Sequence, residues 1–109
     1  MAVTTNRVTL FAMKFEWDEA KNEKNIRQRG VDFEDAAEMF EGPMLVRPDG
    51  RKSYGETRYI GFGYVQGRLM AVAFTERDPD IIRIISLRKA NKREQANFEK
   101  AIRDGLDAH

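Results

Sequence analysis

Residues 58–88 read RYIGFGYVQGRLMAVAFTERDPDIIRIISLR, and they contain three runs rich in apolar, β-branched and aromatic residues. In each run the side chains alternate between two faces, which predicts three β-strands. Turn-forming residues separate the runs at Gln66–Gly67 and at Asp78–Asp80. Because links this short join antiparallel neighbours, the segment predicts an antiparallel meander.

One strand and one helix are predicted before this meander. The segment Val8–Trp17 is rich in aliphatic and aromatic residues and predicts a first strand, in which Trp17 anchors the core. Asp18 then provides an N-cap for a helix over Glu19–Arg29, and the glycine that follows ends it. The helix is polar nearly all round, so we expect it to lie on the surface, with its main apolar positions at Ala20 and Ile26.

Two further helices are predicted, one on each side of the meander. Asp32 caps a segment whose apolar residues repeat at the spacing of a buried helical stripe: Phe33, Ala36, Ala37 and Phe40. Gly42 and Pro43 end it. After the meander, Asn91 and Glu94 have the spacing of a capping box, and a stripe of small or apolar residues follows: Phe98, Ala101, Ile102, Gly105 and Leu106.

The order strand, two helices, three strands and helix is typical of an α+β domain. We therefore predict an antiparallel sheet with two N-terminal helices and a C-terminal helix. At 109 residues the chain has room for one modest core. Residues 1–13 would be an N-terminal extension or the first strand, and residues 14–109 a single domain. Such a sheet buries one face under helices and leaves the other open to a large ligand.

Composition excludes several classes of function. The chain has no cysteine, and its one histidine is the terminal His109, so neither a disulfide framework nor a zinc site is expected. No apolar run approaches the roughly 20 residues that span a bilayer, and the first residues lack the plan of a signal peptide. We expect a cytoplasmic protein that has no membrane partner and needs neither metal nor cofactor.

Charge is unevenly distributed, although the formal net charge is only +1. Glu16–Glu41 carries nine acidic and four basic residues, whereas Ile81–His109 carries seven basic and four acidic ones. Within the second segment, Arg83–Arg93 joins a strand to a helix and contains five basic residues and no acid. Fixed cations beside unpaired backbone N–H groups suit a polyanion such as RNA.

Each of these basic residues also has a structural explanation. Arg83 lies between isoleucines and either faces the open side of the sheet or pairs with a carboxylate, for which Glu76 is a candidate. Arg88 follows five residues later, so regular alternation puts it on the opposite face unless a bulge intervenes. Lys92 and Arg93 occupy the first turn of a helix, where the macrodipole disfavours cations. They either bind an anion or are simply solvated.

A polar loop, GRKSYGETR at residues 50–58, leads into the meander. It is either a solvated approach to the hairpin or a segment that positions an acid, a base and a cation. Cleavage of RNA through its own 2′-hydroxyl needs a proton acceptor, cations for the charged transition state and a proton donor. With no internal histidine, Glu56, Tyr54 or Lys52 would have to assist the proton transfers.

Several segments together resemble the BrnT family of type II toxins. They include FEWDEAK at residues 15–21, FTER at residues 74–77 and IRIISLRKA at residues 82–90, and the similarity covers about residues 14–102. The resemblance implies a RelE-like fold with helices on one side of the sheet, and a ribonuclease that arrests growth. It also implies a BrnA-like ribbon-helix-helix antitoxin, which neutralises the toxin and binds operator DNA with it.

Because the sequence has no cluster of carboxylates or histidines, we expect a metal-independent site. The resemblance implies that its toxin-like residues are Arg77, Arg83, Arg88, Glu56 and Arg58, and we expect the first four to be catalytic. Beside them, we expect the basic residues of the meander and its junction with the last helix to bind RNA: Arg58, Lys89, Lys92 and Arg93. The chain departs from the family at two histidines. Family members often have KHG where this chain has Gln28, Arg29 and Gly30, and a His-Ser pair where it has Lys52 and Ser53. The alternative function is a non-catalytic module that binds an antitoxin or operator DNA.

Overall fold

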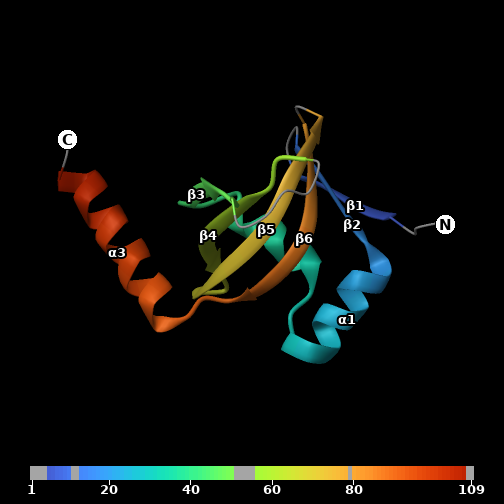
Figure 1. Cartoon of the computed structure of the whole chain (residues 1–109), viewed down its shortest axis with the longest axis horizontal. Helices are drawn as coiled ribbons and strands as arrows, with labels where there is room; N and C mark the ends of the chain where they lie inside the picture. Colours follow the sequence, from blue (N-terminus) through green and yellow to red (C-terminus); the bar gives the residue numbers. More distant parts are fainter. Residues whose placement is uncertain (1–4, 11–12, 51–55, 79, 108–109) are drawn as a thin grey trace.

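The computed structural model describes residues 5–10, 13–50, 56–78 and 80–107 (Figure 1). Its strands are β1 (Thr5–Leu10), β2 (Met13–Asp18), β3 (Leu45–Pro48), β4 (Tyr59–Val65), β5 (Arg68–Asp78) and β6 (Ile81–Lys89). Its helices are α1 (Glu19–Arg29), the 3-10 turn η1 (Phe33–Asp35), α2 (Ala36–Met39) and α3 (Lys92–Asp107). The α+β class predicted from the sequence is confirmed.

The six strands form one sheet in the order β1-β2-β6-β5-β4-β3. Strands β4, β5 and β6 form the predicted antiparallel meander at its centre. The turn between β4 and β5 has positive φ at Gln66 (49°) and Gly67 (78°). Two successive residues of this kind twist a tight hairpin in the same sense as its strands.

Three features of the sheet differ from the prediction. Strand β2 pairs with β6 in parallel, so the sheet is mixed and not purely antiparallel. The single strand expected at Val8–Trp17 is two strands, β1 and β2, paired antiparallel with Leu10 opposite Met13. Strand β3, at the far edge, was not predicted. It has only four residues and ends in proline, so its alternation of side chains is too short to predict a strand.

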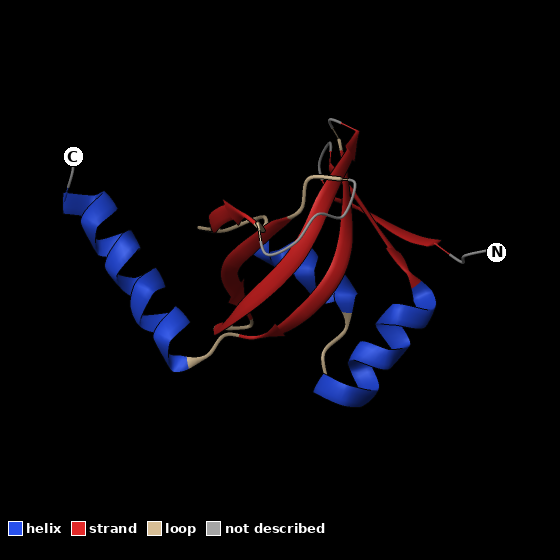
Figure 2. Cartoon of the chain, in the orientation of Figure 1, coloured by secondary structure: helices blue, strands red, loops and turns tan. Residues whose placement is uncertain are grey.

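One face of the sheet is covered by α1, η1 and α2, as Figure 2 shows. The core beneath these helices combines side chains from β2, β5 and β6 with Phe33, Ala36 and Met39 of the helical segment. Trp17 is part of this core, as expected. The segment predicted as one helix after Asp32 is a 3-10 turn followed by a single α-helical turn, and its stripe is buried as the spacing indicated.

Helix α1 has the predicted bounds and caps. Asp18 accepts hydrogen bonds from the Ala20 and Lys21 N–H groups, and Gly30 ends the helix with a left-handed φ of 72°. As expected for a surface helix, α1 leaves its main apolar residues, Ala20 and Ile26, exposed. The buried side chains of α1 are those of Asn22 and Asn25.

These two asparagines attach α1 to the rest of the domain by hydrogen bonds. The amide Nδ2 of Asn25 donates to the carbonyl oxygens of Leu87 (2.9 Å) and Val31 (3.1 Å). The amide of Asn22 donates to Asp32, and its oxygen accepts from the N–H of Phe33. A surface helix with few apolar residues is thereby held against β6 and η1.

Helix α3 lies on the other face of the sheet, which corrects the expectation that all helices share one side. Its Phe98 is packed in a second, smaller core with Ala90 and with residues of β4 and β5: Ile60, Phe62, Leu69 and Ala71. These strand residues alternate with those of the first core, so they point the opposite way. Beyond Phe98, α3 runs away from the sheet (Figure 1).

Candidate functional site

A β-bulge in β6 brings the predicted arginines to one face of the sheet. Ala73 pairs with Ser86 and Phe74 pairs with Ile84, so one extra residue, Ile85, interrupts the alternation. As a result, Arg83 and Arg88 both point away from α1 and α2. We call this side the arginine face and define it by the paired residues Arg83–Thr75, Ser86–Ala73 and Arg88–Ala71 of β6 and β5.

The two arginines nevertheless lie far apart along this face. Arg83 is opposite Thr75 and Arg88 is opposite Ala71, so their positions are four residue steps apart along β5. At roughly 3.3 Å per residue this is about 13 Å. In the described conformations the two side chains contact different carboxylates, Glu16 for Arg83 and Glu94 for Arg88.

Arg83 instead shares a carboxylate with Arg77. The Nη1 of Arg83 is 3.4 Å from Oε1 of Glu16, and the Nη1 of Arg77 is 3.7 Å from the same oxygen. The parallel register of β2 and β6 sets Glu16 directly beside Arg83. We call these three side chains the Glu16 cluster. Glu16 is 6% exposed, Arg83 24% and Arg77 56%, so the carboxylate lies beneath the two guanidinium groups.

The chain that enters β4 is anchored beside the Glu16 cluster. The hydroxyl of Thr75, which is opposite Arg83, donates to the carbonyl oxygen of Thr57 at 2.6 Å. The two residues that flank Thr57 form an ion pair, with Nε of Arg58 3.7 Å from Oε2 of Glu56. Glu56 and Arg58 are therefore held near the cluster. Tyr54 and Lys52 lie outside the described residues.

Arg88 has a different environment from Arg83. Its two terminal nitrogens donate to the two oxygens of Glu94 at 2.8 and 2.9 Å. Glu94 also accepts from the N–H of Asn91, and its own N–H donates to the Asn91 side chain, which completes the predicted capping box. The hydrogen bonds from Arg88 are the main reason why the pKa of Glu94 falls from 4.5 to about 2. The Arg88–Glu94 contact therefore joins the end of β6 to the first turn of α3.

The remaining predicted RNA-binding residues surround this junction. Lys89 ends β6, and Lys92 and Arg93 begin α3, and all three side chains are exposed. Lys92 and Arg93 add positive charge beside Arg88, whereas Lys89 pairs with Met70 of the first core and so points to the other face of the sheet. The predicted candidates thus form two groups: Arg77, Arg83, Arg58 and Glu56 at one end, and Arg88, Lys89, Lys92 and Arg93 at the other.

Glu16 and Thr75 were not among the candidates from the sequence. The alternation in β2 indicated that Glu16 points away from Phe15 and Trp17. Its contact with Arg83 could not be inferred, because it depends on the parallel pairing of β2 and β6, and the two residues are 67 positions apart in the sequence. Glu76, the partner considered for Arg83, lies opposite Ile82 instead.

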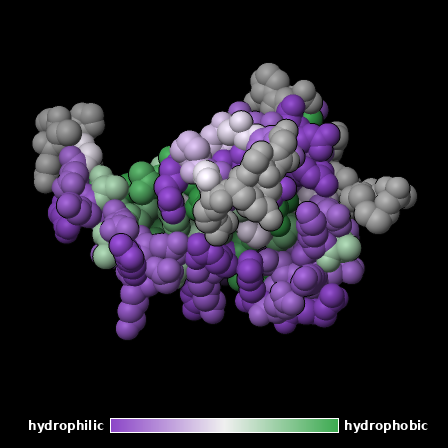
Figure 3. All heavy atoms as spheres, in the orientation of Figure 1, coloured by the Kyte–Doolittle hydropathy of each residue, from purple (hydrophilic) through white to green (hydrophobic). Residues whose placement is uncertain are grey.

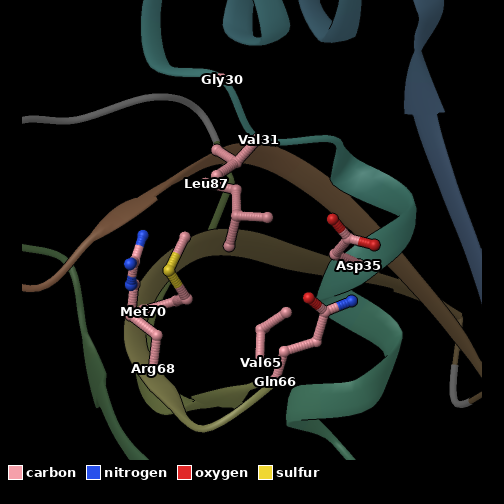
Figure 4. Close-up of a pocket in the computed structure, with 8 residues that line it drawn as sticks. All are labelled: Gly30, Val31, Asp35, Val65, Gln66, Arg68, Met70 and Leu87. Carbon is pink, nitrogen blue, oxygen red and sulfur yellow. The ribbon is translucent and has the colours of Figure 1, made fainter.

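A cavity of about 300 Å³ lies on the opposite face, under the hairpin between β4 and β5 (Figure 4). Asp35 and Gln66 stand on one side of it, Arg68 on the other, and Met70 and Leu87 form part of its apolar wall. Burial, and then the charges of Asp32 and Glu38, raise the pKa of Asp35. No residue of the arginine face lines this cavity.

Within the described residues, no three Asp, Glu, His or Cys side chains are grouped so as to hold a metal ion. Nor is any helix in that part of the chain long and apolar enough to cross a membrane. The arginine face presents guanidinium groups on one side of a small α+β domain.

Comparison with known proteins places the chain in a class of ribonuclease toxins. Residues 17–94 match the family model described as the ribonuclease toxin BrnT of type II toxin-antitoxin systems. The chain belongs to the BrnT family. Among solved structures it is similar to the Brucella abortus ribonuclease toxin BrnT, determined at 1.1 Å resolution. That match has 28% sequence identity and a TM-score of 0.54, and it covers 70% of this chain and 94% of the Brucella chain. No curated protein matches the chain.

Proposed function

We propose that this chain is a metal-independent endoribonuclease that cleaves RNA in the cytoplasm and so arrests growth. The observation that carries the proposal is the Glu16 cluster, in which two guanidinium groups surround one carboxylate on the arginine face. The three side chains of the cluster carry two positive charges and one negative charge, so their net charge is +1. Because more than half of the Arg77 side chain is exposed, a phosphodiester can approach this charge from solvent.

The guanidinium groups of Arg77 and Arg83 would bind the scissile phosphate and stabilise its transition state. When the 2′-hydroxyl attacks, negative charge grows on the phosphate oxygens, and fixed donors with planar geometry oppose it. Their positive charge is a reason why no metal is required. Glu16 would act as a positioning residue, since it holds both guanidinium groups from beneath and is itself buried.

Proton transfer would be carried out by the segment that precedes β4. Among the described residues of this segment, Glu56 has a carboxylate. The hydrogen bond from the Thr75 hydroxyl to the carbonyl of Thr57 holds the adjacent backbone beside the cluster. We propose Glu56 as the group that accepts the 2′ proton, with Tyr54 or Lys52 of the adjoining loop assisting. Arg58, which pairs with Glu56, would hold the substrate near this group.

The second basic group would bind the same RNA strand farther along. Arg88 lies about 13 Å from Arg83 along the strands, a distance that suits a neighbouring nucleotide better than the scissile phosphate. Lys92 and Arg93 are exposed around it and would add further phosphate contacts. Contacts of this kind supply affinity without reading the base sequence.

The activity can be tested by incubating the purified chain with RNA in excess EDTA. We expect cleavage that leaves 2′,3′-cyclic phosphate or 3′-phosphate ends, because the 2′-hydroxyl is the attacking group. Product ends can be identified by labelling and by sensitivity to a phosphatase. Intact RNA in EDTA would contradict the metal-independent mechanism, and intact RNA both in EDTA and with added Mg²⁺ would favour a non-catalytic binding module.

A type II family implies an antitoxin partner. We propose that this partner is a BrnA-like ribbon-helix-helix protein that covers the arginine face and links the toxin to operator DNA. Adding the antitoxin in slight excess should abolish cleavage, because the surface that binds RNA would be buried. A complex in which Arg77 and Arg83 stay open to solvent would contradict this arrangement.

A further inference from the structure

A second cluster of basic side chains lies outside the arginine face, along α1. It surrounds a pocket of about 260 Å³ between α1, η1 and β6, which we call the α1 pocket. Phe33 and Asn25, which are 1% and 7% exposed, lie at its floor. Its rim is formed by exposed side chains of α1: Lys21, Lys24, Gln28 and Arg29. None of its described lining residues belongs to the arginine face.

The α1 pocket forms where a helix borders the end of β6. Strand β2 pairs with β6 only as far as Trp17 and Ile84. Past this point the side-chain amide of Asn25 donates to the carbonyl oxygen of Leu87. Ile85, the extra residue of the bulge, lines the pocket. Because α1 contacts this edge through a side chain and not through a backbone ladder, space remains between the helix and the strand.

The charged side chains around the α1 pocket are all of one sign. Lys21, Lys24 and Arg29 carry three positive charges, and the two acidic residues of α1, Glu19 and Glu23, do not line the pocket. Among the described residues neither lysine forms an ion pair. Lys21 also stands in the first turn of α1, where the macrodipole disfavours a cation. A bound anion would relieve the repulsion between these three charges.

Hydrogen-bond donors at the rim are held in place from the floor. The Nη1 of Arg29 donates to Oδ1 of Asn25 at 3.3 Å, and Asn25 is itself bonded to Val31 and Leu87. This contact occupies one nitrogen of a guanidinium group that has five N–H donors, so others can face an anion. The amide of Gln28 adds neutral donors. Several donors and three cations suit a phosphate group, which has several charged oxygens.

We propose that the α1 pocket binds one phosphate group, either of an RNA strand or of a free nucleotide. Lys21 and Lys24 supply positive charge, and Arg29 donates hydrogen bonds to the phosphate oxygens. The volume of about 260 Å³ is below the roughly 300–1,000 Å³ of pockets for larger ligands, so it suits a phosphate with little more than its sugar. Figure 3 shows a mostly hydrophilic surface over α1, where the rest of a nucleotide can stay in water.

The first arm of the test measures binding of a free nucleotide. Adenosine 5′-monophosphate is titrated into the isotope-labelled chain, and the side-chain amide signals of Asn25 and Gln28 are followed by NMR. We expect saturable shifts with the nucleotide and none with adenosine, which lacks the phosphate. Lys21→Ala with Lys24→Ala should weaken this binding at least about tenfold, because two charged contacts are lost. Replacing both lysines by arginine should preserve it.

Lys100→Ala is the matched control, since Lys100 is an exposed lysine of α3 that does not line the pocket. This variant should bind the nucleotide as the wild type does. Acetate at the same ionic strength should leave the two amide signals in place. Equal shifts with acetate, or unchanged nucleotide binding in the double alanine variant, would overturn the proposal.

The second arm identifies the source of the phosphate with a fully 2′-O-methylated oligoribonucleotide, which cannot be cleaved through its 2′-hydroxyl. If a strand phosphate occupies the pocket, the double alanine variant should reduce the dependence of log K on log salt by about 0.7. An unchanged slope together with lost nucleotide binding assigns the pocket to free nucleotides. An unchanged slope without any nucleotide binding overturns the proposal. Neither arm measures cleavage, so the outcome does not depend on the ribonuclease activity.

Discussion

Arginine side chains contact carboxylates in two different ways on the arginine face. Arg88 makes two short hydrogen bonds to Glu94, which is also part of a helix cap. Arg77 and Arg83 instead approach one oxygen of Glu16 at 3.7 and 3.4 Å, and two cations share it. Both terminal nitrogens of Arg88 donate to Glu94, whereas Arg77 and Arg83 each contact Glu16 through one nitrogen. The other N–H groups of Arg77 and Arg83 could bind a ligand. The structural alternative considered for Arg83, pairing with a carboxylate, is confirmed with Glu16 in place of Glu76, and Arg88 is paired as well.

The pH dependence of stability tests the contact between Arg88 and Glu94. Arg88 lowers the pKa of Glu94 from 4.5 to about 2, so ionised Glu94 stabilises the folded state above pH 4.5. This contribution is lost as the pH falls from about 4.5 to about 2, because the unfolded chain takes up the proton first. We expect the free energy of unfolding to fall less steeply over this range in Glu94→Gln than in the wild type.

Urea denaturation at a series of pH values measures this difference. Glu99→Gln, which removes an exposed carboxylate from the same helix, is the matched control and should keep the wild-type slope. Identical slopes for Glu94→Gln and the wild type would show that Arg88 does not hold Glu94 as described.

At the level of elements, α1 is unusual because asparagines attach it to the sheet. The carbonyl oxygens of Leu87 and Val31 both accept a hydrogen bond from the side-chain amide of Asn25. Asn25→Ala should lower the free energy of unfolding by about 1–3 kcal/mol, since buried carbonyls would lose their donor. Asn97→Ala, at an exposed position of α3, should change it by no more than about 0.5 kcal/mol. Equal stability of the two variants in urea would contradict this role of Asn25.

Local sequence patterns predicted the elements that depend on neighbouring residues. The meander, the caps at Asp18 and Asn91, and the glycine stop of α1 follow from alternation, capping and turn chemistry. Contacts between distant segments could not be predicted in the same way. The parallel pairing of β2 with β6 sets Glu16 beside Arg83, and the bulge at Ile85 turns Arg88 to the same face. Neither the parallel pairing nor the bulge produces a recognisable pattern in the local sequence.

At the scale of the whole molecule, the sheet separates two surfaces. The helix-covered side carries the acidic residues of Glu16–Glu41 apart from Glu16 itself, which points to the arginine face. The other side carries the Glu16 cluster at one end and the basic junction with α3 at the other. This separation keeps the carboxylates of α1, η1 and α2 away from the surface that we propose binds RNA, for which affinity depends on the number of phosphates contacted.

The most direct measurement of the central claim is the single-turnover rate of RNA cleavage by Arg83→Ala. If Arg83 stabilises the scissile phosphate, the rate should fall by about a hundredfold or more while the circular dichroism spectrum is retained. Arg27→Ala, which removes an exposed arginine from α1, should cleave at the wild-type rate. Cleavage by Arg83→Ala at the wild-type rate would contradict the assignment of the reaction to the Glu16 cluster.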